Sequence, residues 1–597
     1  MCGIAGLVGL SASSSPEVGT KADVVEHFVD SLAHRGPDGQ GAYRNGPCVL
    51  VHTRLAIIDV EGGDQPFVAR RDGGGDNEVA LIANGEIYNN PELRAHMMST
   101  PFASQSDCEP PLYLYLKHGL DYVDHLRGMY AIAIWDAAHE RLVLSRDPFG
   151  IKNLYYAHTP HGFAFASEPR ALIAPKLRKA QLNADKRDEL LQLQFTTGAD
   201  TAFAGIRRLE PGETIVVEKG EVVERRRRAA LPAGGPQQIS RNTALMELDR
   251  ILNDVVGVHQ RSDVPYGMFL SGGIDSSVLL AMMSRLNEQP VTAFTAGFTG
   301  TAVPDEREHA RELARVERAH HIEVEFGEQD FWSELPRIVR HMDDPAADYA
   351  VLPTWKLAQT ARAEGIKVVL AGEGGDELFG GYGRYRAAKR WLFPKEMYRK
   401  GIMDGLDVLI DADPARAWRA GVAQAGIEAR LPGRTRLQVA QAQDIATWLP
   451  GDLLTKADRM LMAHGVEGRV PFLDAKLADF VFTWPDRLKI HHGLGKATLR
   501  HWLASAMPAA RPFSKKRGFT VPVGEWIAGQ GVRVGDLVAA QESIQAVCKP
   551  DAVRDLFAVP IGRPGKAAWT LLFYALWHKI HIEGVAPDGD VFDVLSA

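Results

Sequence analysis

Cysteine is scarce in this chain, with four among 597 residues and no Cys-x-x-Cys pair. Cysteines scattered in this way argue against a disulfide framework and against a structural zinc site, because both need clustered thiols. The sequence also lacks any apolar run of about 18 residues, and it does not open with the basic and apolar segments of a secretion signal. We therefore expect a cytoplasmic protein from a reducing compartment, without a membrane span.

A positive charge excess is absent as well, since the formal net charge is −7. Such a chain has no general basic field that would attract nucleic acid or an anionic membrane. Its 45% apolar and 24% charged residues exclude a disordered or fibrous protein, and its length allows two to four domains. We expect small-molecule substrates, no nucleic-acid or membrane partner, and leave a homodimer open.

The most informative residue that is present is Cys2. Removal of Met1 would give Cys2 both a thiol and a free α-amine. A thiol with a pKa of about 8.5 is mostly protonated at neutral pH, and an α-amine with a pKa of about 8 can act as its general base. Cys2 is therefore a candidate nucleophile.

The chain divides into two halves that differ in the pattern of their apolar residues. Short apolar runs in the first half predict strands, with few helices, at residues 48–52, 78–83, 129–135, 141–145 and 162–166. The Pro- and Gly-rich composition of residues 229–238 is typical of a linker. We place the domains at residues 1–228 and 241–597, with a linker at 229–240.

Strands and helices alternate in the second half. We predict strands at 265–270, 290–298, 322–326 and 366–371, and helices at 242–258, 275–286 and 306–319. This alternation predicts a parallel sheet covered on both faces, with ligands at the carboxyl ends of its strands. Residues 386–597 are predicted to be mostly helical.

Two Gly-rich turns follow predicted strands. The first is Ser-Gly-Gly-Ile-Asp-Ser-Ser at residues 271–277, which leads into a helix. Glycines, hydroxyl groups and a helix N-terminus together suit a phosphate group. The second turn, at residues 371–382, contains Glu373 and Asp376.

The first turn resembles the pyrophosphate loop of ATP pyrophosphatases. With Cys2, the second turn, and the segments 453–459, 467–474 and 515–522, nearly the whole chain resembles the glutamine-hydrolysing asparagine synthetases. The resemblance implies an α+β N-terminal-nucleophile domain with αββα layers. It implies next an α/β doubly wound parallel-sheet ATP-pyrophosphatase domain with a helical C-terminal part. The implied substrates are glutamine, aspartate and ATP, with Mg²⁺ as cofactor.

In the first half, six short segments carry this resemblance: 2–4, 34–38, 52–57, 84–89, 106–109 and 145–152. By position the family assigns Arg54 to the α-carboxylate of glutamine, and Asp107 and Glu86 to the ammonium side. The Asn84 side chain and the Gly85 N–H are assigned to the oxyanion. These residue types suit a zwitterion with a neutral reacting end. Cys108 is interpreted as a small buried residue.

In the second half, the resemblance implies that Asp275 and Asp376 hold Mg²⁺ on pyrophosphate, which fits the preference of this ion for carboxylates and phosphates. Glu373 would guide ammonia or accept its proton, and Lys516, with Lys515 as the other register, would neutralise the phosphates. The predicted ATP-binding residues are Leu270, Ser271, Gly272, Gly273, Asp275, Ser276, Ser277, Ala371, Gly372 and Glu373.

The acceptor is the open question of this reading. Residues 341–353 lack the threonine and arginine expected of the best-known asparagine synthetases, so another carboxylate is the alternative acceptor. A glutaminase with an inactive second half and a non-catalytic sensor are disfavoured by the intact turns. Aspartate would need a cation and an anion, and the candidates are Arg384, Arg459 or Arg469 with Asp344 or Asp348.

Overall fold

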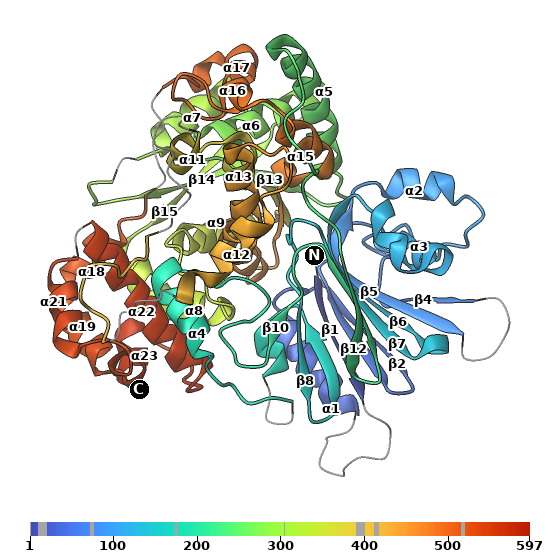
Figure 1. Cartoon of the computed structure of the whole chain (residues 1–597), viewed down its shortest axis with the longest axis horizontal. Coiled ribbons are helices and arrows are strands. Elements are labelled where there is room, and N and C mark those ends of the chain that lie inside the picture. Colours follow the sequence, from blue (N-terminus) through green and yellow to red (C-terminus); the bar gives the residue numbers. More distant parts are fainter. Residues whose placement is uncertain are drawn as a thin grey trace.

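A computed structural model describes residues 2–9, 21–71, 77–173, 177–303, 305–389, 400–410, 417–514, 520–560 and 562–597. In Figure 1 the strands of the first half lie on one side of the molecule and most of the second half lies on the other, while the helix Ala184–Leu193 lies among the C-terminal helices. No described helix combines the length and the apolarity needed to cross a bilayer.

The first half contains two six-stranded antiparallel sheets. One has the order β10-β8-β9-β1-β3-β2 and the other β12-β11-β7-β6-β5-β4. The strands are β1 (Cys2–Gly9), β2 (Gly39–Asn45), β3 (Cys48–Arg54), β4 (Phe67–Arg70), β5 (Glu78–Ile87), β6 (Gly128–Asp136), β7 (Arg141–Arg146), β8 (Tyr155–Thr159), β9 (Gly162–Ala166), β10 (Arg207–Arg208), β11 (Glu213–Glu218) and β12 (Glu221–Arg227). The five strands predicted here are confirmed.

Buried side chains from both sheets form a shared apolar core that includes Ile4, Leu50, Ile82 and Leu144. The helices of this half are α1 (Lys21–Leu32), α2 (Asn90–His96), α3 (Pro110–His118) and α4 (Ala184–Leu193). Leu193, at the end of α4, belongs to a buried cluster with Trp418 and Val422 of the second half. The two halves therefore interlock and do not meet only at the linker.

The second half is built on a five-stranded parallel sheet, in the order β15-β14-β13-β16-β17. The strands are β13 (Tyr266–Phe269), β14 (Thr292–Phe298), β15 (His320–Phe326), β16 (Val368–Leu370) and β17 (Glu467–Arg469). The parallel sheet and its first four strands are confirmed. The fifth strand, β17, was not predicted, because three residues in a long helical region carry no strand pattern.

Helices surround this sheet and continue to the C-terminus. The helices that precede or follow the first four strands along the chain are α5 (Arg241–His259), α6 (Ile274–Leu286), α7 (Arg307–Val316), α8 (Glu328–His341), α9 (Val351–Ala363), α10 (Gly375–Phe379) and α11 (Gly383–Ala388). The later ones are α12 (Ala420–Glu428), α13 (Arg436–Ala446), α14 (Thr455–Met462), α15 (Ala475–Phe482), α16 (Asp486–Lys489), α17 (Ala497–Ala506), α18 (Val523–Gly529), α19 (Gly531–Ala540), α20 (Glu542–Gln545), α21 (Pro550–Ala558), α22 (Arg563–His581) and α23 (Val591–Ser596). The buried face of α22 includes Trp569, Phe573 and Trp577.

Candidate functional site

Cys2 lies at the start of β1, where its neighbour across the sheet is Arg54 at the end of β3. Only 7% of Cys2 is exposed, and burial raises the pKa of its thiol. A thiol in this environment stays protonated at neutral pH, so it needs a base next to it to become a nucleophile. The Cys2 amide nitrogen donates a hydrogen bond of 3.1 Å to Asn84 Oδ1.

Asn84 and Gly85 lie on β5 beside this thiol. Asn84 is fully buried, and its Nδ2 has no hydrogen-bond partner among the described residues. A buried donor without a partner is costly unless a ligand uses it, and an oxyanion is such a ligand. A Cβ at position 85 would lie 2.3 Å from the Met129 carbonyl oxygen, so glycine allows the close approach of β5 and β6.

Arg54 is held by the loop that follows β3. Its guanidinium donates to the carbonyl oxygens of Asp59 at 2.6 Å and Val60 at 2.9 Å, and pairs with Asp64 at 2.9 Å. A guanidinium held in one orientation suits a planar carboxylate. The predicted glutamine-binding arginine therefore lies next to the predicted nucleophile.

The two acids predicted for the ammonium side are both buried near these residues. Asp107 Oδ2 accepts hydrogen bonds from the Ile87 amide at 2.6 Å and from the Cys108 thiol at 3.5 Å. Burial raises the pKa of Asp107. Glu86 Oε2 forms an ion pair of 2.9 Å with Arg469 Nη2, a residue of the second half. Cys108 is buried, as predicted.

The first Gly-rich turn connects β13 to α6. Gly273 is the N-cap of α6, and its carbonyl oxygen accepts from Ser277 Oγ at 2.7 Å. Ser271 Oγ accepts from the Gly273 amide at 3.3 Å, and Gly272 has a φ of 68°. The turn therefore presents hydroxyl groups and a helix N-terminus at the carboxyl edge of the sheet, as phosphate binding requires.

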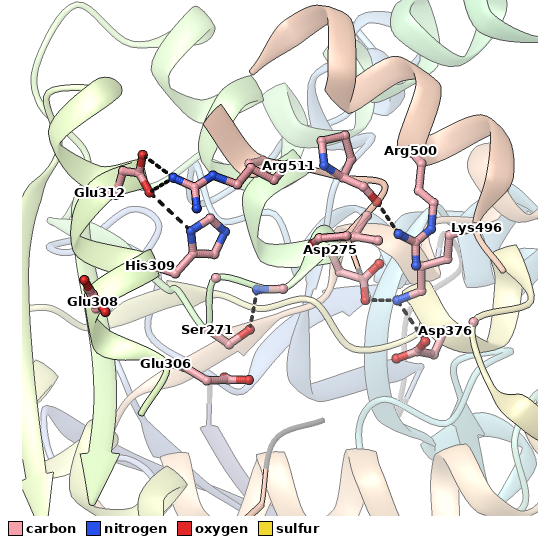
Figure 2. A pocket seen from close by; sticks show the side chains of 17 residues that line it. Ser271, Asp275, Glu306, Glu308, His309, Glu312, Asp376, Lys496, Arg500 and Arg511 are labelled. Carbon is pink, nitrogen blue, oxygen red and sulfur yellow. Dashed lines mark hydrogen bonds and ion pairs between the residues drawn. The ribbon is translucent and has the colours of Figure 1, made fainter. Parts of the chain in front are cut away.

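The second turn meets the first because β16 is next to β13 in the sheet. The contact is tight, since a Cβ at Gly375 would lie 2.5 Å from Asp275 Oδ1. Asp275 and Asp376 both pair with the ammonium group of Lys496, the latter at 2.9 Å, as Figure 2 shows. Burial opposes the charge of Lys496, but the two carboxylates raise the pKa of this group above its ordinary value.

Asp275, Asp376 and Lys496 line a cavity of about 810 Å³. Gly272 and Gly273 also line it, and α7 supplies another wall with His309 and Glu312 (Figure 2). Leu270 and Ala371 are buried and do not line this cavity.

Lys496 and Arg500 are cavity residues that the sequence interpretation missed. A Gly-Lys pair that directly precedes a helix, at residues 495–496, was the available signal.

Glu373 lies elsewhere, in a second cavity of about 40 Å³. Residues of both halves line this smaller cavity, including Ile151 and Lys152 of the first half and Ala371, Gly468 and Val470 of the second. Glu373 Oε2 is buried and has no hydrogen-bond partner among the described residues. A buried carboxylate oxygen of this kind is available to accept a proton or a hydrogen bond.

Most of the candidate aspartate-binding residues are engaged in other ion pairs. Arg384 pairs with Asp444 at 2.7 Å, and Arg459 pairs with Asp343 at 2.9 Å. Asp344 pairs with Arg208 at 2.6 Å. Arg469 is fully buried between the two halves.

Asp348 also forms an ion pair, with Lys456 at 3.0 Å. This pair differs from the others because it lies close enough to Glu373 for the charge of Glu373 to act on the lysine. Lys516 and Lys515 lie outside the described residues.

Comparisons with known proteins agree with this arrangement. The family model described as glutamine amidotransferase domain matches residues 1–227, and the model described as asparagine synthase matches residues 247–579. Asparagine synthetase [glutamine-hydrolyzing] 1 of Bacillus subtilis is 30% identical, over 98% of this chain and 97% of its own length.

Asparagine synthetase B [glutamine-hydrolyzing] of Escherichia coli is 28% identical over 88% of this chain and 83% of its own, and amidase chyE of Penicillium rubens is 28% identical over 82% and 84%. Because a family model matches more than half of the chain and a relative matches it almost end to end, the chain belongs to the asparagine synthase family and carries a glutamine amidotransferase domain.

Proposed function

We propose that this protein makes asparagine from aspartate, with glutamine as nitrogen donor and ATP as energy source. The observation that carries the proposal is the small cavity that holds Glu373 and is lined by residues of both halves. Such a cavity suits the transfer of a small neutral molecule. A glutaminase or an ATP-binding protein alone has no need of it.

In the first half, Cys2 would attack the side-chain amide of glutamine once Met1 is removed, with its own α-amine as the base. Asn84 Nδ2 and the Gly85 amide would stabilise the oxyanion. Arg54 would bind the α-carboxylate, while Asp107 and Glu86 would bind the α-ammonium. Hydrolysis of the thioester then releases glutamate, and the amide nitrogen leaves as ammonia.

In the second half, the β-carboxylate of aspartate would attack the α-phosphorus of ATP. β-Aspartyl-AMP forms and pyrophosphate leaves toward the first turn. Ammonia then displaces AMP, and Glu373 accepts the proton that this nitrogen loses. We assign Lys516 to the charge that develops on the phosphates.

Magnesium fits the residues that line the larger cavity, because Asp275 and Asp376 present two carboxylates to one cation, Lys496. Mg²⁺ is commonly bound by one or two carboxylates together with substrate phosphates. When bound, the ion would neutralise charge on the leaving pyrophosphate.

Lys456 and Asp348 supply the charges that an α-amino acid needs. Their pair lies 3.0 Å apart, is largely buried, and is close enough to Glu373 for the charges to interact. We assign Lys456 to the α-carboxylate of aspartate and Asp348 to its ammonium. This places the β-carboxylate toward Glu373 and the second turn.

We assign residues 1–228 to an N-terminal-nucleophile glutaminase domain with αββα layers, residues 229–240 to a linker, and residues 241–597 to an ATP-pyrophosphatase domain with a helical C-terminal part. The matched family ranges support these boundaries. The test is an assay of the purified chain with glutamine, Mg-ATP and aspartate. We expect asparagine, glutamate, AMP and pyrophosphate; no asparagine and no pyrophosphate above background, with turnover restored by another carboxylic acid, would contradict the assignment.

A further inference from the structure

Arg469 joins the two halves at the glutamine pocket. It lies on β17 of the second half, is fully buried, and distributes its donors over four acceptors. Nη2 pairs with Glu86 at 2.9 Å, and Nε pairs with Glu467 at 2.5 Å. Nη1 donates to the carbonyl oxygens of His259 at 3.0 Å and Arg261 at 2.5 Å. A guanidinium with this many partners has one orientation only.

The acidic partner, Glu86, lies in surroundings that disfavour its charged form. Burial raises the pKa of its carboxyl well above the ordinary value, the neighbouring acids Asp107 and Glu467 raise it further, and Arg469 opposes them. Tyr88 and Cys108 also face Glu86, and burial raises both of their pKa values. Without Arg469, Glu86 would bind a proton more readily and lose its attraction for an ammonium group.

The main chain of Arg469 reaches the other site. Its carbonyl oxygen accepts from the Ala371 amide at 2.9 Å, two residues before Glu373. Leu370 and Arg469 are direct partners in the parallel pairing of β16 and β17. Gly468 and Val470, on either side of Arg469, line the small cavity that holds Glu373.

We propose that Arg469 is a positioning residue of the glutamine site, supplied by the synthetase half: it holds the Glu86 carboxylate in place for the α-ammonium of glutamine. Its main chain ties the same position to the turn that carries Glu373. The glutamine pocket is therefore complete only when the synthetase half is docked on it. This inference rests on the proposed function of the first half as a glutaminase.

The experiment compares Arg469→Met and Arg469→Lys with the unaltered protein. In Arg469→Met we expect the KM for glutamine to rise about 10- to 100-fold, because a buried carboxylate loses its charged partner. The glutamine-dependent rate should fall more than the ammonia-dependent rate. The loss should shrink as the pH rises, since Glu86 then regains its charge, and Arg469→Lys should restore part of it.

A matched control is Arg208→Lys, which alters another buried arginine between the halves. Arg208 pairs with Asp344 through both Nε and Nη2 at 2.6 Å, and within the described part of the chain it makes no hydrogen bond or ion pair with Glu86. We expect it to lower the melting temperature without changing the ratio of the two rates. The combination Glu86→Gln with Arg469→Met should raise the KM no further than either change alone.

Equal effects of the Arg469 and Arg208 variants on that ratio, or an unchanged KM for glutamine in folded Arg469→Met, would overturn the inference. If Arg469→Met does not fold, Arg469→Lys decides by the same KM and pH readouts. Failure of the proposed function is distinguishable, because the unaltered protein would then release no glutamate from glutamine.

Discussion

At the scale of single residues, Cys2 has a buried thiol of raised pKa, and its amide contacts Asn84, the proposed oxyanion donor, on β5 of the other sheet. We expect Cys2→Ala, or retention of Met1, to abolish asparagine formation from glutamine, because nucleophile and base are on the same residue. Formation from ammonia should persist. The two nitrogen sources are compared in one assay of asparagine, and glutamine-dependent product from Cys2→Ala would refute the mechanism.

Asp376 belongs to the same scale, because the proposal assigns its single carboxylate to the ion at the phosphates. In Asp376→Asn, we expect synthesis from either nitrogen source to fall about 10²-fold or more, since a fixed charge at the phosphates is lost. Glutamate release should continue, because Asp376 does not face the thiol. Pyrophosphate and glutamate are measured in parallel, and a matching loss of both would indicate misfolding in place of a local effect.

At the scale of elements, the close approach of β5 to β6 positions Asn84 and Gly85, the proposed oxyanion donors. A Cβ at Gly85 would lie 2.3 Å from the Met129 carbonyl oxygen and 2.7 Å from the Tyr130 Cα, both in the main chain of β6. Gly85→Ala must therefore displace β5, and we expect glutaminase activity to fall about 10²-fold while ammonia-dependent synthesis remains.

The matched control for this change is Gly257→Ala in α5, where a Cβ would meet no atom within 4 Å. Alanine favours a helix by about 0.5–1 kcal/mol relative to glycine, so this variant should be as stable as the unaltered protein or more so. Glutaminase rates and melting temperatures of both variants decide the point. Full glutaminase activity in Gly85→Ala would show that β5 tolerates the shift.

At the scale of the whole molecule, buried histidines make stability depend on pH. Burial lowers the pKa values of His52, His259 and His581 from 6.5 to about 3. The unfolded chain then binds these protons first as the pH falls. The contribution of these three neutral histidines to the free energy of unfolding is complete above pH 6.5 and is lost between pH 6.5 and about 3. Each histidine contributes a slope of up to about 1.4 kcal/mol per pH unit.

We expect the free energy of unfolding to fall steadily from pH 7 to 4. His581→Phe removes one of these groups, whose Nε2 lies 3.0 Å from the Val339 carbonyl oxygen. This variant should be less stable at pH 7 but show a smaller slope. Urea titrations at several pH values measure the slope, and an unchanged slope would mean that His581 does not titrate on unfolding.

Sequence alone determined the features that depend on neighbouring residues. Alternating apolar runs predicted β3, β5, β6, β7 and β9, and the switch to strands and helices predicted the parallel sheet. The first Gly-rich turn could be assigned to phosphate binding because glycine, serine and a helix start act within a few residues. Cys2 was proposed from its position after Met1, and Asn84 and Asp376 were proposed from the family resemblance; in the structure Cys2 contacts Asn84, and Asp376 lines the larger cavity.

The tertiary structure decided what depends on residues that are distant along the chain. The strand β17 pairs with β16 about one hundred residues earlier, Val368 with Glu467, and no local pattern encodes that pairing. Lys496 reaches Asp275 and Asp376 from a third segment. Arg469, one of three candidates for the carboxylate of aspartate, pairs with Glu86 of the first half. The physical reason is that local sequence sets the conformation of each element, whereas burial of apolar faces and pairing of buried charges set which elements meet.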